Sequence, residues 1–74
     1  MKTLNDLKPG EKATICGFAD RDADMAYLME LGMMEGTTVT FVKSAPLGDP
    51  IEIDVRGYHL SLRRSRARAI QVAG

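Results

Sequence analysis

The chain has 74 residues, of which 45% are hydrophobic and 27% are charged, and its ten basic and ten acidic residues balance to zero. We expect one domain over residues 1–74, because this length supports at most one core. The sequence contains no run of about 18 apolar residues, the length needed to cross a membrane. Its N-terminal segment lacks the apolar core of a signal peptide. Cys16 is the one cysteine, so no disulfide within the chain can staple the fold and a cytoplasmic protein is expected.

The charges are unevenly distributed along the chain. Residues 1–54 carry five basic side chains against all ten acids, and residues 55–74 carry five arginines and no acid. Asymmetry of this kind can indicate an anionic partner. In a small fold the two halves lie close together, so mutual neutralisation is the simpler interpretation.

The first predicted strand covers about residues 11–18, where a mixed apolar run follows the turn signal Pro9-Gly10. Cys16 lies in the middle of this strand. Because of this position, we expect its thiol to be buried. We also expect the thiol to be inert, because no basic group is spaced to activate it.

A helix of about ten residues follows. Its apolar positions recur at helical spacing, namely Met25, Leu28 and Met29 with Ala26 and Leu31 beside them. Asp20 or Asp22 can cap its N-terminus, and Gly32 suits the position just past its end. The aspartates at 20, 22 and 24 alternate like the first ligands of a calcium loop, but the glycine and distal glutamate of that loop are absent, so capping explains them.

A second strand is predicted over residues 37–43, after a turn at Glu35-Gly36. A hairpin follows, because the alternation of apolar and polar residues changes phase across Arg56-Gly57. A two-residue turn there opposes residues 55 and 58, 53 and 60, and 51 and 62. The face predicted to enter the core consists of Ile51, Ile53, Val55, Tyr58, Leu60 and Leu62.

The C-terminal segment predicts a short closing strand with Ala69 or Ile70 and Val72 facing inward, after a helical turn that begins at Ser65. Five short strands and one short helix, without βαβ spacing, predict a mainly β fold and a small five-stranded β-barrel. Residues assigned a structural role in turns are Gly32, Gly36, Gly48, Asp49, Pro50 and Gly57.

The arginines at 63, 64, 66 and 68 could bind phosphate, as small nucleic-acid-binding barrels do. Binders of single strands also need exposed aromatic side chains for stacking. This chain has two phenylalanines and two tyrosines, and Tyr58 is in the inward register. A solvated or acid-paired arginine cluster is therefore favoured, and no nucleic-acid partner is expected.

His59 is the other candidate for chemistry. In the predicted register it lies opposite Asp54, and Glu52 is diagonal to Arg63, which is typical of cross-strand charge pairs. One histidine and one cysteine without short ligand spacing are a weak metal signal. We expect no metal site, no cofactor and no catalytic residue.

Methionines cluster on and just after the helix, at positions 25, 29, 33 and 34. One short helix cannot bury all of these together with Leu28 and Leu31, and exposed apolar patches indicate partners. The alternative, that all of them fill the core, stays open.

Four segments resemble the FeoA family, ferrous iron transport protein A. They are Leu31-Gly32-Met33-Met34-Glu35-Gly36, Gly48-Asp49-Pro50, Leu62-Arg63-Arg64 and Ile70-Gln71-Val72. Glu35 replaces a proline often present in the family's turn, and Arg66 stands where many members have an acid. The resemblance covers essentially the whole chain and implies an SH3-like β-barrel.

The resemblance further implies a non-enzymatic accessory protein that binds FeoB, the membrane ferrous-iron transporter with a cytoplasmic GTP-binding domain. The chain would be cytoplasmic and peripheral to the inner membrane through this partner, with weak homo-oligomerisation as a further possibility. The predicted partner-binding residues are an apolar anchor and a set of steering arginines: Leu28, Met29, Leu31, Met33, Met34, Arg63, Arg64 and Arg66.

Two alternatives belong to other classes of protein. One is a nucleic-acid-binding barrel. The other is a metal-sensing domain, related to the C-terminal domain of metal-dependent repressors, that uses His59, Asp54 and Cys16.

Overall fold

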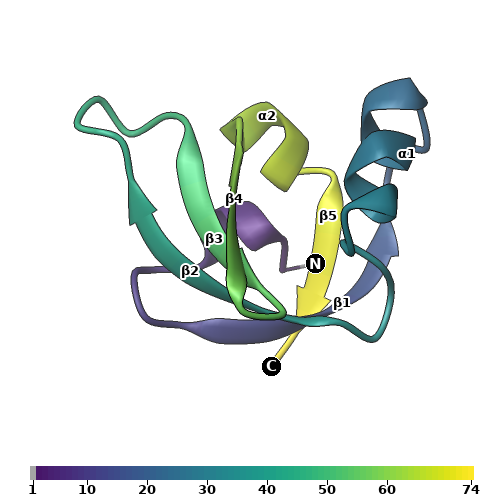
Figure 1. The fold of residues 1–74 in the computed structure, drawn as a ribbon, viewed down its shortest axis with the longest axis horizontal. Helices are drawn as coiled ribbons and strands as arrows, with labels where there is room; N and C mark the ends of the chain where they lie inside the picture. The colour runs from purple at the N-terminus through teal and green to yellow at the C-terminus, as the bar shows by residue number, and fades with distance from the viewer. Residues whose placement is uncertain (1) are drawn as a thin grey trace.

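The computed structural model describes residues 2–74, and five antiparallel strands dominate it (Figure 1). The strands are β1 (Lys12–Phe18), β2 (Thr38–Ser44), β3 (Ile51–Val55), β4 (Tyr58–Leu62) and β5 (Ile70–Ala73). They form one sheet in the order β4-β3-β2-β1-β5, so that β4 and β5 are its two edges. The helical elements are η1 (Leu4–Asp6), α1 (Ala23–Glu30) and α2 (Arg64–Ala67). The predicted mainly β, barrel-like architecture is confirmed.

The β3–β4 hairpin has the predicted register. Cα partners include Val55 with Tyr58 and Ile51 with Leu62. Arg56 and Gly57 between the strands have φ values of 52° and 91°. Positive φ at both central residues defines the two-residue type I′ turn, whose twist matches that of the flanking strands.

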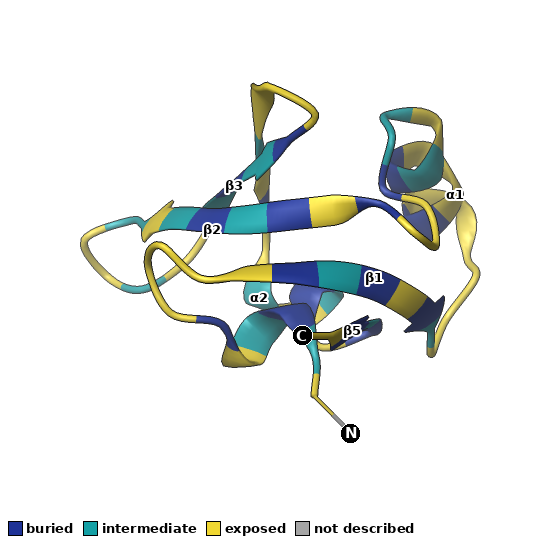
Figure 2. Ribbon diagram, turned by 90° about the horizontal axis from the view of Figure 1, so that it is seen from below, coloured by how far each residue is buried: buried dark blue, intermediate teal, exposed yellow. Residues whose placement is uncertain are grey.

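Buried side chains alternate with exposed ones along the strands, as the colours of β1 and β2 show in Figure 2. The core contains one aromatic ring, that of Phe41. The ten largest fully buried side chains are Phe41, Leu4, Ile15, Met25, Met33, Ile51, Ile53, Ile70, Val39 and Val55. The predicted inward positions Ile70 and Val72 of the closing strand are buried.

Cys16 is exposed, so the prediction of a buried thiol was wrong. The inward positions of β1 are Ala13, Ile15 and Gly17, which places Cys16 on the other side of the strand. The β1–β5 ladder also changes register between Ile15 and Gly17, so that Cys16 is the additional residue of a β-bulge.

Tyr58 was predicted to enter the core, but 42% of it is exposed. It has the inward register and lies at the start of β4, an edge strand that pairs only with β3 among the described strands. Leu60, further along the same strand, is half-buried. Side chains at a free edge are covered on one side only, which explains both outcomes.

No helix within residues 2–74 is long and apolar enough to cross a bilayer.

Candidate protein-docking surface

The helix α1 is fixed at its N-terminus by charge. The Asp22 carboxylate accepts a hydrogen bond from the Met25 amide at 3.0 Å, which caps the helix. Arg66, on α2, donates to Asp22 and to Asp24 at 2.7 Å each. The Met25 amide and Arg66 lower the pKa of Asp22, and Asp22 in turn raises the pKa of Arg66. This contact joins acids of the first half of the chain to the basic second half, as neutralisation predicts.

Arg64 is also held inside the chain. Its guanidinium donates to the Gly48 carbonyl and, at 2.9 Å, to the Asn5 side chain, and it lies 5.9 Å from the centre of the Phe41 ring. The Arg64 amide donates to Asp49 at 3.0 Å. These contacts tie α2 to the loop before β3 and to η1. The position of Arg64 therefore does not support its predicted role in steering a partner.

Arg63 differs from both neighbours, because it is exposed and forms no ion pair within residues 2–74. Arg56, in the β3–β4 turn, is also exposed, with one long hydrogen bond of 3.4 Å to the Thr37 hydroxyl. Of the three predicted steering arginines, Arg63 alone has a guanidinium that forms no hydrogen bond or ion pair in the described part of the chain.

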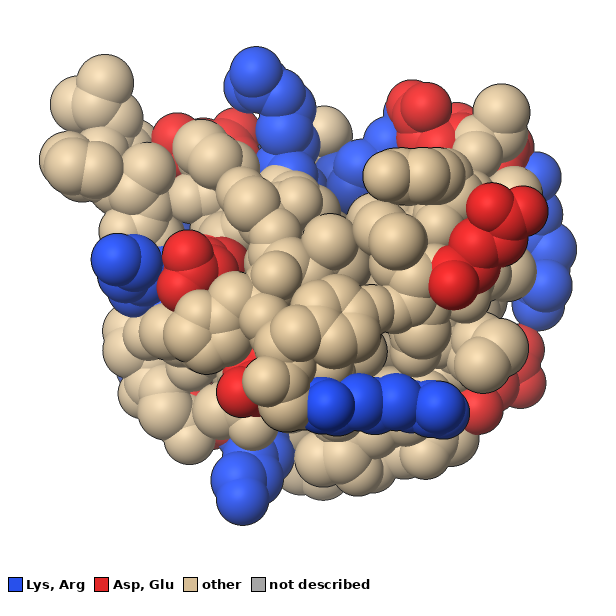
Figure 3. Space-filling model, in the orientation of Figure 1, with Lys and Arg blue, Asp and Glu red and all other residues tan. Residues whose placement is uncertain are grey.

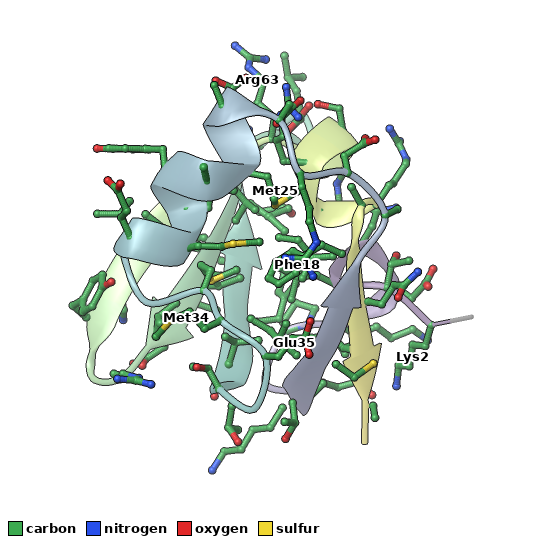
Figure 4. All side chains as sticks on the ribbon, turned by 90° about the vertical axis from the view of Figure 1, so that its right-hand side faces the viewer. Lys2, Phe18, Met25, Met34, Glu35 and Arg63 are labelled. Atoms are coloured by element: carbon green, nitrogen blue, oxygen red, sulfur yellow. The ribbon has the colours of Figure 1, made fainter. Side chains whose placement is uncertain are left out.

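The predicted apolar anchor is divided between core and surface. Met33 is fully buried and Leu28 is 7% exposed, so the expectation that they form a surface patch was wrong for these two residues. Met29 and Leu31 are half-buried, and Met34 is 44% exposed. Figure 4 shows Met25 pointing between α1 and the strands, whereas Met34 lies at the outer side below the helix.

The end of α1 explains the burial of Met33. Gly32, with φ of 108°, donates to the Met29 carbonyl at 3.0 Å, and the Met33 amide donates to the Leu28 carbonyl at 3.1 Å. These two bonds define a Schellman motif, which usually packs the residue after the glycine against the residue five positions earlier. Met33 and Leu28 occupy those positions, and both are buried.

Two tyrosines that the sequence did not assign to a binding role enlarge the exposed apolar surface. Tyr27 on α1 is 61% exposed, and Tyr58 on β4 is 42% exposed. A Cβ placed on Gly32 would lie 3.4 Å from the Tyr58 hydroxyl oxygen, so β4 and the end of α1 are adjacent. We call this region the α1–β4 surface, and it comprises Tyr27, Met29, Leu31, Met34, Tyr58 and Leu60.

A groove of about 430 Å³ runs beside this surface, between α1, β4 and the start of α2. Its lining includes Tyr27 and Leu28 from the helix, Ser61 and Leu62 from the strand, and Arg63 directly after the strand. Figure 3 shows this side of the molecule as mainly uncharged in the middle, with charged side chains around the margin. An apolar centre with a polar rim is the usual anatomy of a protein interface.

One more exposed apolar side chain lies apart from this surface, on the loop between β2 and β3. Leu47 is 98% exposed there. No role was predicted for Leu47 from the sequence.

His59 lies on the outer face of the hairpin, opposite Asp54 as predicted. Its Nδ1 is 3.0 Å from Glu52, and its Nε2 is 3.7 Å from Asp54. The expected diagonal pair between Glu52 and Arg63 is absent from the ion pairs of residues 2–74. Cys16 is on β1, which β2 and β3 separate from β4 in the sheet. Three ligating side chains do not converge anywhere in the described chain, so the suggested metal-sensing set is not assembled.

A family model described as FeoA domain matches residues 2–74. The Fe(2+) transport protein A/Fe(2+) transporter FeoB fusion protein of Porphyromonas gingivalis is 36% identical over 69 residues. These residues are 93% of this chain and 8% of that protein, so the chain spans a small part of its relative's length.

Several solved structures have a fold similar to that of this chain. The FeoA protein from Chlorobium tepidum is 38% identical with a TM-score of 0.91, over 96% of this chain and 68% of that one. Zinc-complexed FeoA from Stenotrophomonas maltophilia, described as an SH3 domain protein and a candidate activating factor of ferrous iron transport, is 28% identical with a TM-score of 0.84, over 99% and 91% of the two chains. A manganese-dependent transcriptional repressor, 19% identical with a TM-score of 0.85 over 97% and 35% of the two chains, shares the fold alone.

Proposed function

Because this chain belongs to the FeoA family, we propose that it is an accessory protein of ferrous iron transport that docks on the FeoB transporter. The Porphyromonas gingivalis relative supports this pairing, since it joins both units in one polypeptide. A covalent link keeps two modules at high effective concentration, which favours a contact between them. The proposed role is binding and regulation, with no reaction catalysed by the chain itself.

The proposed docking site is the α1–β4 surface, and its exposed tyrosines and Met34 are the observation that carries the proposal. Tyrosine and methionine are enriched at interfaces, where they fill pockets on a partner. Exposed apolar side chains gathered on one side of so small a domain are the usual mark of an interaction site. Arg63, which lines the groove, would meet an acidic group of the partner and steer its approach.

The transporter's cytoplasmic GTP-binding part is the proposed point of contact. The chain would then be cytoplasmic and held at the inner membrane through FeoB.

The test is a binding measurement against the organism's own FeoB, reconstituted in lipid nanodiscs and immobilised for interferometry. We expect Met34→Asp and Tyr27→Asp each to weaken binding at least 10-fold, because each buries a charge in an apolar contact. Leu47→Asp is the matched control, since it places the same charge on an exposed apolar position outside the surface. Loss of binding in Leu47→Asp alone would contradict the proposed site, and no binding of the unmodified chain would contradict the proposed function.

A further inference from the structure

The strand β4 has one unpaired edge. A two-residue turn makes Val55 and Tyr58 a hydrogen-bonded pair, and such pairs alternate along an antiparallel ladder. Tyr58, Leu60 and Leu62 therefore direct their amides and carbonyls to β3. His59 and Ser61 direct theirs to the outside, and β4 has no partner strand other than β3 in residues 2–74.

The opposite edge of the sheet is covered, so the two edges of the sheet differ. β5 forms a bridge from Gln71 to Thr3, and the Val72 amide donates to the Lys2 carbonyl at 3.0 Å. Natural sheets protect exposed edges with lysine, proline or bulges, because a free edge pairs with other chains. The segment YHLSL contains neither residue, and its ladder with β3 has no bulge.

The groove adjoins the C-terminal end of this open edge. It contains Ser61, one of the two residues whose main-chain groups face outward, and it separates β4 from Tyr27 and Leu28 of α1. Alternate side chains of a strand point to opposite faces. A chain added beside β4 would therefore direct alternate side chains to opposite faces, and those next to Ser61 and Leu62 would enter the groove over Leu28.

Charge at the two ends of β4 indicates what kind of segment fits. Arg56 precedes the strand and Arg63 follows it, and neither forms an ion pair in the described chain. Arg66, which also lines the groove, is neutralised by Asp22 and Asp24. An occupant with acidic side chains at both ends of an apolar stretch complements this arrangement.

We propose that β4 binds an extended segment of the transporter by strand addition, with apolar residues at alternate positions of that segment and acidic residues at its ends. This inference rests on the proposed function, and adds to it the backbone conformation and the chemistry of the bound segment. Main-chain hydrogen bonds to His59 and Ser61 supply affinity, and the groove selects the side chains.

The decisive measurement is quenched hydrogen-exchange NMR on the full chain, alone and saturated with FeoB in nanodiscs. Amides that face outward from β4 exchange quickly in the free protein. We expect exchange at His59 and Ser61 to slow at least 10-fold on binding, whereas Tyr58 and Leu60 are protected in both states because β3 already pairs with them.

Two substitutions at one position separate main-chain pairing from side-chain contact. Ser61→Pro removes the outward N–H without removing a bond to β3, and proline is tolerated at such edge positions. We expect it to weaken binding at least 10-fold, whereas Ser61→Ala, which keeps the N–H, binds normally. If the proline variant fails to fold, the exchange experiment on the unmodified chain still tests whether β4 binds by strand addition.

The outcomes separate this inference from the function on which it rests. Absence of binding to FeoB would overturn both. Binding without added protection at His59 and Ser61 would overturn strand addition and leave the docking function standing. If protection of the His59 and Ser61 amides rises with the concentration of the chain in the absence of FeoB, the occupant is a second copy of the chain. That result would also overturn strand addition by the transporter.

Discussion

Met33 and Met34 are adjacent in sequence, but they should respond very differently to the same truncation. Met33→Ala removes three heavy atoms from a side chain that is fully buried. At about 0.8 kcal/mol for each methylene-sized group, the transfer loss is about 2.4 kcal/mol, and a residual cavity adds to it. We therefore expect a loss of about 2–4 kcal/mol in the free energy of unfolding. For a chain of this size that corresponds to a melting temperature lower by roughly 10–25 °C.

Met34→Ala is the matched comparison, because 44% of Met34 is exposed and its removal leaves no closed cavity. We expect it to cost less than about 1 kcal/mol, since only part of the transfer loss applies. Urea unfolding followed by circular dichroism measures both variants under the same conditions. Equal losses in the two variants, or a neutral Met33→Ala, would refute the division of the predicted anchor into a core residue and a surface residue.

Three further predictions concern charge, the thiol and Arg64. The lowered pKa of Asp22 means that its charge stabilises the fold above the carboxyl's ordinary pKa of 3.8, and that this contribution is lost as the pH falls through the lowered folded-state value. In thermal melts from about pH 5 to pH 2, Asp22→Asn should therefore lose less stability than the unmodified chain, and an equally steep decline would argue against the ion pair with Arg66. Cys16 should react with Ellman's reagent in the folded protein nearly as fast as in urea, because it is exposed; labelling only after unfolding would show that it is buried. Arg64→Met keeps the aliphatic stem but removes two side-chain hydrogen bonds. It should therefore lower the free energy of unfolding, measured by urea titration, by about 1–3 kcal/mol. An unchanged free energy of unfolding would show that Arg64 is a free surface residue.

The sequence predicted the hairpin well because two local signals agree there. Alternation of apolar and polar residues gives the face, and the turn at Arg56-Gly57 gives the register. The same alternation misled the prediction for Tyr58. Alternation identifies which side of a sheet a residue faces, whereas the extent of its burial depends on whether another element covers that strand. That information is not local, since β4 became an edge through the order of all five strands.

The burial of Met33 could have been predicted from the sequence. Gly32 was identified as the residue past the helix end, and a glycine there commonly forms a Schellman motif that packs the next residue against the last helical turn. The exposure of Cys16 had a signal too, because Ala13 and Ile15 set an inward register that excludes position 16.

The arginines could not be separated by sequence. Arg66 reaches acids more than 40 residues away, at Asp22 and Asp24, and Arg64 reaches Asn5 at the other end of the chain. Spacing along the chain does not encode such contacts. Arg63, which directly precedes Arg64 in sequence, is free because the fold brings no acid of residues 2–74 to it.

Docking through the α1–β4 surface is most directly tested with the methionine methyl groups. The chain would be labelled with 13C at the methionine methyl groups and titrated with FeoB in nanodiscs, with methyl NMR as the readout. We predict that the Met29 and Met34 signals shift or broaden on binding, while those of the fully buried Met25 and Met33 remain unchanged. Unchanged Met29 and Met34 signals at saturating FeoB would contradict docking through this surface.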